Sequence, residues 1–266
     1  TADNAMVFSG TVANINSAIA TITWTSASNS NTNAVLTMTP NDGADGAADT
    51  VAITVNAVND APSSAGDTAT VDEDTAYVSW TTQSDWGYAD TESSAMTQIK
   101  LIALPGDGTL TDDDENACDD QGTGACEAND IIILAELDDL FYTGDANFNG
   151  ADSFTFQVYD GAAWSSTATM SITVSAVNDV PTWSASANDV SGNEDTAISI
   201  TGSTIADVDD SSMDSFTMTS TQGGTYSLAQ TTGLTFSTGD GTADNAMVFS
   251  GTVANINSAI ATITWT

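Results

Sequence analysis

Acidic residues recur in the same order at two places along the chain. Each series holds a Glu-Asp pair in the phrase EDT, an acid-x-acid step, an Asn-Asp pair in the phrase VND, and an Asp in a turn, NDG or YDG. The members are Asp42, Asn59, Asp60, Glu73, Asp74, Asp90, Glu92, Asp160, Asn178, Asp179, Glu194, Asp195, Asp207 and Asp209. Because calcium takes roughly six to eight oxygen ligands from carboxylates, amides and backbone carbonyls, the pattern predicts calcium sites.

Each acid also has an ordinary structural explanation. Asp and Asn side chains in turns and caps accept hydrogen bonds from nearby backbone amides, and for any single acid that explanation stays open. Magnesium prefers a stricter octahedron that keeps several waters, and softer metals would require His or Cys ligands. For each series as a whole, calcium is the expected ligand.

The charge of the chain excludes several classes of function. It holds 37 Asp and Glu against one cation, Lys100, with no Arg and no His, for a formal net charge of −36. One lysine cannot form the basic patch that nucleic acids or anionic lipids require. Without His or Arg there is no histidine relay and no phosphoryl clamp, so no enzyme is expected, although a hydrolase that uses two carboxylates stays formally open.

The excess of like charge also has to be offset. Repulsion among so many carboxylates destabilises a compact chain unless salt screens it or a divalent cation binds. A general adaptation of the surface to salt would explain many of the acids. It does not explain why some of them cluster in two matching series.

Two cysteines, Cys118 and Cys126, lie eight residues apart in the polar loop ENACDDQGTGACEAND. In a chain rich in Thr, Ser and Asn, this spacing fits a disulfide that closes a hairpin in an oxidising compartment. Two unpaired thiols are the alternative, since a lone C-x7-C pair makes a poor zinc site. The chain has no run of 18 apolar residues, so no membrane-spanning segment is expected.

One stretch occurs twice without a change: residues 1–25 and residues 242–266 are identical, which sets a period of 241 residues. Identity over this length is typical of a tandem array. The stretch combines apolar spacing of three and four with a short alternation, so we expect a helical crossover that leads into a core strand. Its core positions are Val12, Ile15, Ile19, Ile22 and Trp24.

Two linker phrases divide the period, ITVNAVNDAP at 53–62 and SITVSAVNDVP at 171–181. In each, an alternating strand pattern runs into a proline that cannot continue a β-ladder. Cutting there gives the C-terminal part of one module at 1–60, a complete module at 61–180, and the N-terminal part of the next module at 181–266.

The rest of the chain is predicted to form short strands. Runs rich in β-branched and aromatic residues are separated by Gly, Asn, Asp and Ser turns at near-regular spacing, which predicts an all-β fold of β-sandwich modules. Several methionines within these runs are expected in the core, as are two tryptophans, Trp24 and Trp80. The methionines are Met6, Met38, Met96, Met170 and Met218.

The ordered set AVNDAP, AVNDVP, EDT, ADVDD, LPGDGTL and ANFNGADSFTFQVYDG resembles the bacterial cadherin-like tandem repeats of very large secreted adhesins. The resemblance implies Ig-like β-sandwiches strung end to end, calcium at the junctions, and an extracellular, cell-surface role. By motif, the calcium-binding acids fall at one junction on Asp60, Glu73, Asp90 and Glu92, and at the other on Asp179, Glu194, Asp207 and Asp209. Against this family, the cysteine loop Asp112 to Asp130 looks like an insertion.

The expected function is therefore structural: a secreted fibre or adhesin stalk of calcium-stiffened tandem repeats that supports adhesion or filament formation. Its partners are neighbouring copies of the same repeat. Since residues 1–60 and 181–266 each hold part of one module, either the covalent array continues, as we expect, or separate subunits complete each other by strand exchange. The alternative is a carbohydrate- or cell-surface-binding module whose exposed aromatics, such as Trp86, Tyr88 and Trp164, stack on sugars.

Overall fold

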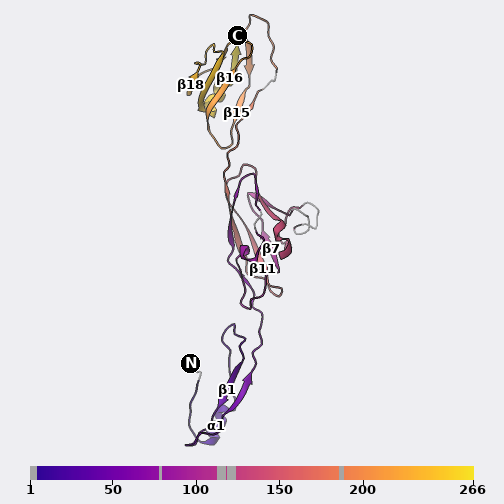
Figure 1. Cartoon of the computed structure of the whole chain (residues 1–266), viewed down its shortest axis with the longest axis vertical. Coiled ribbons are helices and arrows are strands. Elements are labelled where there is room, and N and C mark those ends of the chain that lie inside the picture. Colours follow the sequence, from indigo (N-terminus) through magenta and orange to yellow (C-terminus); the bar gives the residue numbers. More distant parts are fainter. Residues whose placement is uncertain (1–4, 78–79, 113–117, 119–123, 186–188) are drawn as a thin grey trace.

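The computed structural model describes residues 5–77, 80–112, 118, 124–185 and 189–266. Three bodies of β-structure follow one another along its long axis: an N-terminal segment up to residue 60, a central domain over 61–180, and a C-terminal domain from 181 onward (Figure 1). We call the linkers that join them the first junction (residues 54–62) and the second junction (residues 176–181). The expected all-β, Ig-like fold is confirmed.

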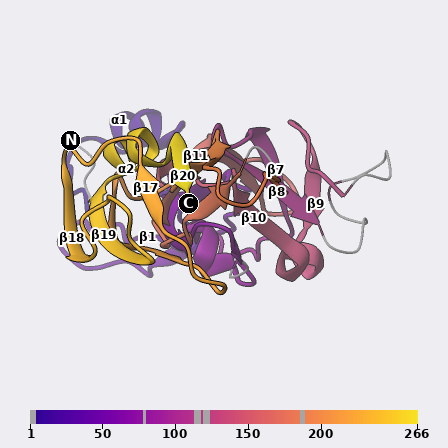
Figure 2. The same cartoon turned by 90° about the horizontal axis from the view of Figure 1, so that it is seen from above.

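The central domain is a sandwich of two sheets. The larger sheet has the strand order β4-β12-β11-β7-β9 and the smaller one β5-β10-β8. The strands are β4 (Asp67–Asp72), β5 (Ala76–Tyr77), β7 (Gln98–Ala103), β8 (Gly108–Asp112), β9 (Ile131–Ile133), β10 (Leu140–Gly144), β11 (Gly150–Tyr159) and β12 (Ala168–Ser175). All neighbours are antiparallel except β12 and β4, which run parallel. In the view along the long axis, β9 lies at the periphery of the domain (Figure 2).

Shorter elements complete the central domain. Strands β3 (Ser63–Ser64) and β6 (Tyr88–Ala89) form a small antiparallel pair next to the first junction. Two 3-10 helices are also present: η1 (Gln83–Trp86) lies between β5 and β6, and η2 (Leu134–Asp139) connects β9 of the larger sheet to β10 of the smaller one. None of the described helices is long and apolar enough to cross a membrane.

Aromatic rings fill the core of the central domain. Alternate residues of β11 point inward, so Phe154 and Phe156 meet Trp86 with ring centroids 6.1 and 4.7 Å away. The Trp86 indole N–H donates to the carbonyl of Trp80 over 3.2 Å, which gives a buried polar group its partner. Trp80 is in the core as expected, but the prediction that Trp86 is exposed is wrong, because η1 turns its ring into the sandwich.

A half-buried carboxylate, Asp152, connects the two sheets. Asp152 on β11 accepts hydrogen bonds from the Tyr142 hydroxyl on β10 (2.9 Å) and from the backbone amides of Gly106 (2.9 Å), Asp107 (3.2 Å) and Ser153 (2.7 Å). Burial alone would raise the pKa of Asp152, but these four donors outweigh it and hold the pKa below its usual range. Burial, followed by the bond to Asp152, raises the pKa of Tyr142.

The cysteine loop carries the expected disulfide, between Cys118 and Cys126, and both cysteines pack against the core of the central domain. The disulfide prediction is confirmed. Residues 113–117 and 119–123 of the predicted insertion lie outside the described residues.

The C-terminal domain has a second, smaller core. Its sheets have the orders β14-β20-β17, β16-β19-β18 and β13-β15. The elements are β13 (Thr182–Ser184), β14 (Ile198–Thr201), β15 (Thr204–Ala206), β16 (Ser212–Thr219), β17 (Tyr226–Leu228), β18 (Leu234–Thr238), β19 (Ala246–Thr252), α2 (Val253–Ile260) and β20 (Thr262–Trp265). Met247, Phe249, Ile256 and Ile260 are buried there, so the expected helical crossover into a core strand is confirmed in this copy of the repeated stretch.

The same stretch behaves differently at the other end of the chain. The N-terminal segment consists of α1 (Val12–Ile19) and one antiparallel hairpin, β1 (Ala34–Met38) and β2 (Asp49–Ile53). The helix forms in both copies because its cap is local: Thr11 and Thr252 each accept a backbone amide three residues on. Residues 6–11, which correspond to β19, form no strand.

Several expected core residues are consequently exposed. Met6, Met38 and Trp24 have 67%, 36% and 46% of their surface exposed, so their prediction as core is wrong for the N-terminal segment. Met96 and Met170 are buried in the central domain, and Met218 packs against the core of the C-terminal domain. Met6, Met38 and Trp24 are exposed because the described part of the N-terminal segment lacks the sandwich strands against which they would pack.

The repeated stretch provides a matched pair of substitutions. Phe249→Ala empties a fully buried site and should destabilise the C-terminal domain by about 3–5 kcal/mol. Phe8→Ala, at the identical position of the other copy, should change the free energy of unfolding by no more than roughly 0.5 kcal/mol, because Phe8 is half exposed. Urea denaturation measures both, and equal effects would contradict the difference in packing described above.

The hydrogen bond between Tyr142 and Asp152 gives a second prediction. Tyr142→Phe removes a hydrogen bond from a buried hydroxyl to a charged, half-buried group and should destabilise the central domain by roughly 1.5–3 kcal/mol, whereas Tyr159→Phe should have little effect. Because the folded pKa of Asp152 is lowered, its contribution is present above its unfolded pKa and is lost as the pH falls. Asp152→Asn should therefore flatten the acid side of the stability profile, and an unchanged profile would contradict this assignment.

Candidate cation-binding junctions

At the first junction, the linker is held by acids of the central domain. The backbone N–H of Asp60 donates to the Glu92 carboxylate over 3.1 Å. The side-chain amide of Asn59 donates to Asp160 over 2.9 Å and to the carbonyl of Asp60 over 2.9 Å. The predicted residues Asn59, Asp60, Glu92 and Asp160 therefore lie together around one linker.

Asp160 accepts several hydrogen bonds at the first junction. It follows β11 directly, and one of its oxygens accepts the amides of Ala162 and Ala163, each over 2.6 Å. Burial alone would raise the pKa of Asp160, but these amides and the Asn59 side chain outweigh it, so the net pKa is lowered and the group stays charged.

Asp90 completes the first junction, from the loop after β6. Its Oδ1 accepts the amide of Ser94 over 2.7 Å, while its Oδ2 is enclosed and has no hydrogen-bond partner among the described residues. The neighbouring Tyr88 has its pKa raised to about 12 by burial and then by the charges of Asp90 and Asp160. Tyr88 thus lies among the acids of the first junction. Its position two residues before Asp90 in the sequence could have indicated this.

A groove of about 350 Å³ runs beside this junction. It is lined by the linker, by Thr91 and Glu92, and by residues 26–31 of the N-terminal segment. Side chains in 26–31 are Ser, Ala and Asn, whose hydroxyl and amide oxygens add neutral donors of the kind that hard cations bind. Residues 26–31 hold no acid, so the acidic pattern of the sequence gave no sign of them.

At the second junction, the most buried acid comes from the start of the central domain. Glu73 is 1% exposed, and its Oε1 accepts the amide of Val177 in the linker over 2.7 Å. Strand β4 runs parallel to β12 and pairs Asp72 with Ser175, so the residue that follows β4 emerges at the end of the domain. The motif-based placement of Glu73 beside Asp60 is therefore wrong: Glu73 lies one junction further on.

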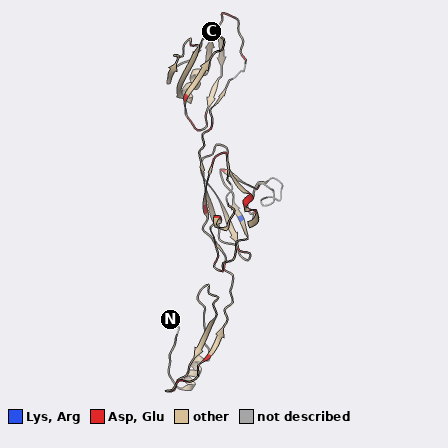
Figure 3. Cartoon of the chain, in the orientation of Figure 1, with Lys and Arg blue, Asp and Glu red and all other residues tan. Residues whose placement is uncertain are grey.

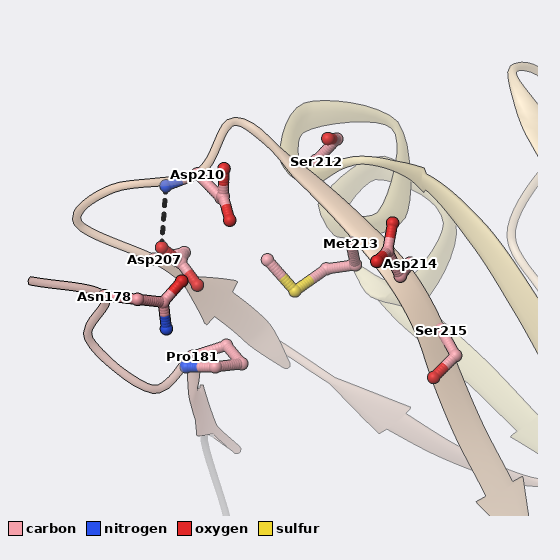
Figure 4. A pocket seen from close by; sticks show the side chains of 8 residues that line it. All are labelled: Asn178, Pro181, Asp207, Asp210, Ser212, Met213, Asp214 and Ser215. Atoms are coloured by element: carbon pink, nitrogen blue, oxygen red, sulfur yellow. Dashed lines mark hydrogen bonds between the residues drawn. The ribbon is translucent and has the colours of Figure 1, made fainter.

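The C-terminal domain supplies the other acids of the second junction. The amide of Asp179 donates to the Asp209 carboxylate over 2.5 Å, and Asp207 accepts the amides of Asp209 (3.0 Å) and Asp210 (2.7 Å). Figure 4 shows Asn178 next to Asp207 on one side of a groove of about 460 Å³, with Met213 on the other side. The loop that holds Asp207 and Asp209 thus contacts the linker before its own domain, as the loop with Asp90 and Glu92 does at the first junction.

Negative charge is concentrated at Asp179. Burial, and then the charges of Asp74, Asp209, Glu73 and Asp207, raise the pKa of the Asp179 carboxyl. No cationic side chain is available nearby, because the single lysine lies on β7 in the central sheet (Figure 3). The second junction therefore holds mutually repelling carboxylates.

Three predicted residues lie away from both junctions. Glu194 and Asp195 are exposed and come just before β14, whose Ile198 pairs with Trp265 near the far end of the C-terminal domain. Asp42 is exposed in the turn between β1 and β2, and since β2 runs toward the linker, this turn lies at the opposite end. The placement of Glu194 at the second junction is thus wrong for the same reason as that of Glu73.

Whether a cation suits these junctions can be judged from the carboxylate oxygens that have no hydrogen-bond donor among the described residues. Within the described residues, no three Asp, Glu or Cys side chains form a closed metal-binding group. However, the enclosed side-chain atoms without a hydrogen-bond partner include Glu73 Oε2, Asp90 Oδ2 and Asp179 Oδ2, all at the junctions. A buried carboxylate oxygen without a donor is costly, and all three are oxygen ligands of the kind that calcium binds.

The two facing sheets of the central domain define an Ig-like β-sandwich. Residues 59–173 match the family model described as "Bacterial Ig domain". The central domain is thus similar to a bacterial Ig domain, which agrees with the Ig-like part of the resemblance noted in the sequence. No curated protein sequence matches the chain significantly.

Solved structures resemble the chain only distantly. An endo-fucoidan hydrolase of glycoside hydrolase family 107 has 19% identity and a TM-score of 0.29, covering 84% of this chain and 30% of that one. Extracellular cadherin domains 1–4 of protocadherin gamma B7 have 13% identity and a TM-score of 0.36, covering 83% and 48%. Domains 4–9 of the surface layer protein SbsC have 11% identity and a TM-score of 0.23, covering 84% and 31%. The chain spans less than half the length of each, and similarities this low carry no argument about function.

Removing the charge of Asp179 tests the repulsion at the second junction. Because the folded pKa of Asp179 is raised, its stabilising contribution is present below its unfolded pKa and is lost as the pH rises through the folded pKa. Asp179→Asn should therefore raise Tm at pH 7 in calcium-free, low-salt buffer. The gain should disappear near about pH 3, where the carboxyl is protonated in both states.

Asp138→Asn is the matched control, since Asp138 is an exposed acid on η2 far from the junctions in the sequence and in the fold. It should leave Tm nearly unchanged at both pH values. A lower Tm for Asp179→Asn at pH 7 without calcium would show that the carboxylate is stabilising by itself, against the present interpretation.

Proposed function

We propose that the chain is a structural part of an extracellular fibre or adhesin stalk. Ig-like sandwiches follow one another in a tandem array, calcium binds at the junctions, and the function is length and stiffness. The observation that carries the proposal is the concentration of acids between successive bodies, where three enclosed carboxylate oxygens have no donor in the part of the chain that the structure describes. The recurrence of 25 identical residues supports the array.

We infer the residues that would hold calcium from the contacts of each linker. At the first junction they are Asp60, Asp90, Glu92 and Asp160, with the amide oxygen of Asn59. At the second they are Glu73, Asp74, Asp179, Asp207 and Asp209, with the amide oxygen of Asn178. Both sets include the linker and a domain beside it, and the second set joins the two domains, so a shared cation would restrict their relative motion.

Electrostatics explains why a cation would stiffen the chain. Two carboxylates about 4 Å apart repel by about 1 kcal/mol in water and by ~4 kcal/mol at an effective dielectric constant of 20. At the second junction, acids from two domains face the same linker, so this repulsion favours bent or separated arrangements. A divalent cation reverses the sign of the interaction and favours one arrangement.

The same features support a non-enzymatic role outside the cell. The chain has no His and no Arg, and both grooves border the junctions instead of enclosing a reactive centre. The disulfide and the strongly acidic surface suit an oxidising, salty medium. Of the aromatics considered for sugar binding, Trp86 is buried and Trp164 stacks on Tyr159 at 4.6 Å.

Calcium addition is the direct test. Stabilisation by a ligand at about 100 times its Kd amounts to about 2.7 kcal/mol per site, so saturating calcium should raise Tm by several degrees. Small-angle scattering should show a longer and narrower distribution of end-to-end distances in calcium than in a chelator. An equal ionic strength of NaCl controls for screening.

Combining Asp179→Asn with Asp207→Asn should abolish the calcium effect at the second junction and leave that at the first. An unchanged melting curve and scattering profile on addition of calcium to the unsubstituted chain would overturn the calcium part of the proposal. If images of the isolated material showed no filament or stalk, the proposal of a fibre or stalk would be overturned.

A further inference from the structure

The inference that follows rests on the proposed array and concerns the surface that joins one copy to the next. The C-terminal domain has counterparts of several strands of the central domain but not of all of them. Its sheet β14-β20-β17 has the order of β5-β10-β8, and β16 pairs with β19 as β7 pairs with β9. In the central domain, β7 has a second neighbour, β11, on its other side. Among the described residues, β16 has no such neighbour and forms the edge of its sheet.

The hairpin that would complete this edge is present in the chain, at its other end. In sequence, β1 aligns with β11 and β2 with β12, and both pairs have the same antiparallel register. Leu36 and Met38 correspond to Phe154 and Phe156, and Val51 and Ile53 correspond to Met170 and Ile172. The four counterparts in the central domain are buried, with at most 2% of their surface exposed.

In the N-terminal segment, the same face of the hairpin is uncovered. Met38 and Val51 are 36% and 49% exposed, and Leu36 and Ile53 are only partly covered. The complementary face of β16 is also incomplete, because Phe216 and Met218 are only half-buried where their counterparts Ile99 and Leu101 are fully buried. An unpaired edge beside an uncovered apolar face is a template for an added strand.

We propose that the open edge of β16 binds the β1–β2 hairpin of a second copy of this chain, in the position that β11 and β12 occupy in the central domain. The β1–β2 hairpin of residues 34–53 cannot reach β16 of the same copy, because the N-terminal segment and the C-terminal domain lie at opposite ends with the central domain between them (Figure 1). In a longer chain that continued the period, the next hairpin of that chain would fill the same edge.

The central domain gives the register of the complex. There Phe156 pairs with Leu101 and Gln157 with Lys100. Transferred to the second copy, Met38 faces Met218 in the core, and Thr39 faces Thr217 on the outer surface. Pro40 then takes the place of Val158, whose amide donates to the hydroxyl of Ser165 and not to β7, so its missing N–H costs no bond to β16.

The repeated stretch of the donor copy is not needed in this complex. The acceptor already packs the apolar residues of its own stretch 242–266 into its core, which leaves residues 1–25 of the donor redundant. Hairpin donation by each copy to the next is head-to-tail, so it produces a filament and not a closed dimer.

Paired cysteines test the register on the full chain. Thr39→Cys with Thr217→Cys should give a ladder of covalent multimers on oxidation, seen in denaturing, non-reducing gels. Thr50→Cys with Thr217→Cys is the matched control: Thr50 corresponds to Thr169 on β12, one strand further away, so the two cysteines would be roughly 10 Å apart and should stay unlinked.

Substitutions in the hairpin test the interface. Met38→Asp places a charge in the completed core and should raise the concentration needed for association, measured by sedimentation, by roughly a hundredfold or more. Val35→Asp is its control, because Val35 corresponds to the exposed Ser153 and should leave association nearly unchanged.

Equal cross-linking of the two cysteine pairs, or equal effects of the two aspartates, would overturn the proposed register. A chain that stays monomeric at high concentration would overturn the surface itself. If the chain stays monomeric but stiffens with calcium, the proposed calcium-stiffened function stands and this mode of association is wrong. If the chain associates as described but does not respond to calcium, the mode of association stands and the calcium part of the proposed function is wrong.

Discussion

A β-sandwich can bury its core only when strands from distant parts of the sequence complete both sheets. The repeated stretch makes this constraint visible, since 25 identical residues occur in two surroundings. In the C-terminal domain, Met247 and Phe249 are buried among neighbouring strands, whereas Met6 and Phe8 remain exposed. The helix forms in both places because a capped turn needs only local partners.

The same distinction explains how far the fold could be predicted. Alternation, turn residues and linker prolines are local signals, and they were enough for an Ig-like sandwich, a crossover helix and the disulfide. The burial of particular residues depends on which partner strands are present, so the assignments of Met38 and Trp24 to a core failed. Trp86 failed differently, because a polar neighbourhood in the sequence gave no sign that η1 turns its ring inward.

For the candidate site, the sequence identified most of the acids but not their grouping. Asp60 with Glu92, and Asp179 with Asp209, lie together because each linker contacts the loop of the domain that follows it. Glu73 belongs to the junction after its own domain, since β4 runs parallel to β12. That pairing spans about a hundred residues and leaves no local trace in the sequence.

This parallel pair has a mechanical consequence. The chain enters the central domain shortly before β4 and leaves it directly after β12, so the two strands lie side by side and carry any tension between the linkers. Six residue pairs, from Met170 opposite Asp67 to Ser175 opposite Asp72, would then be loaded in shear. Their hydrogen bonds resist as a group and do not open one after another, which suits a module that has to hold its length under load.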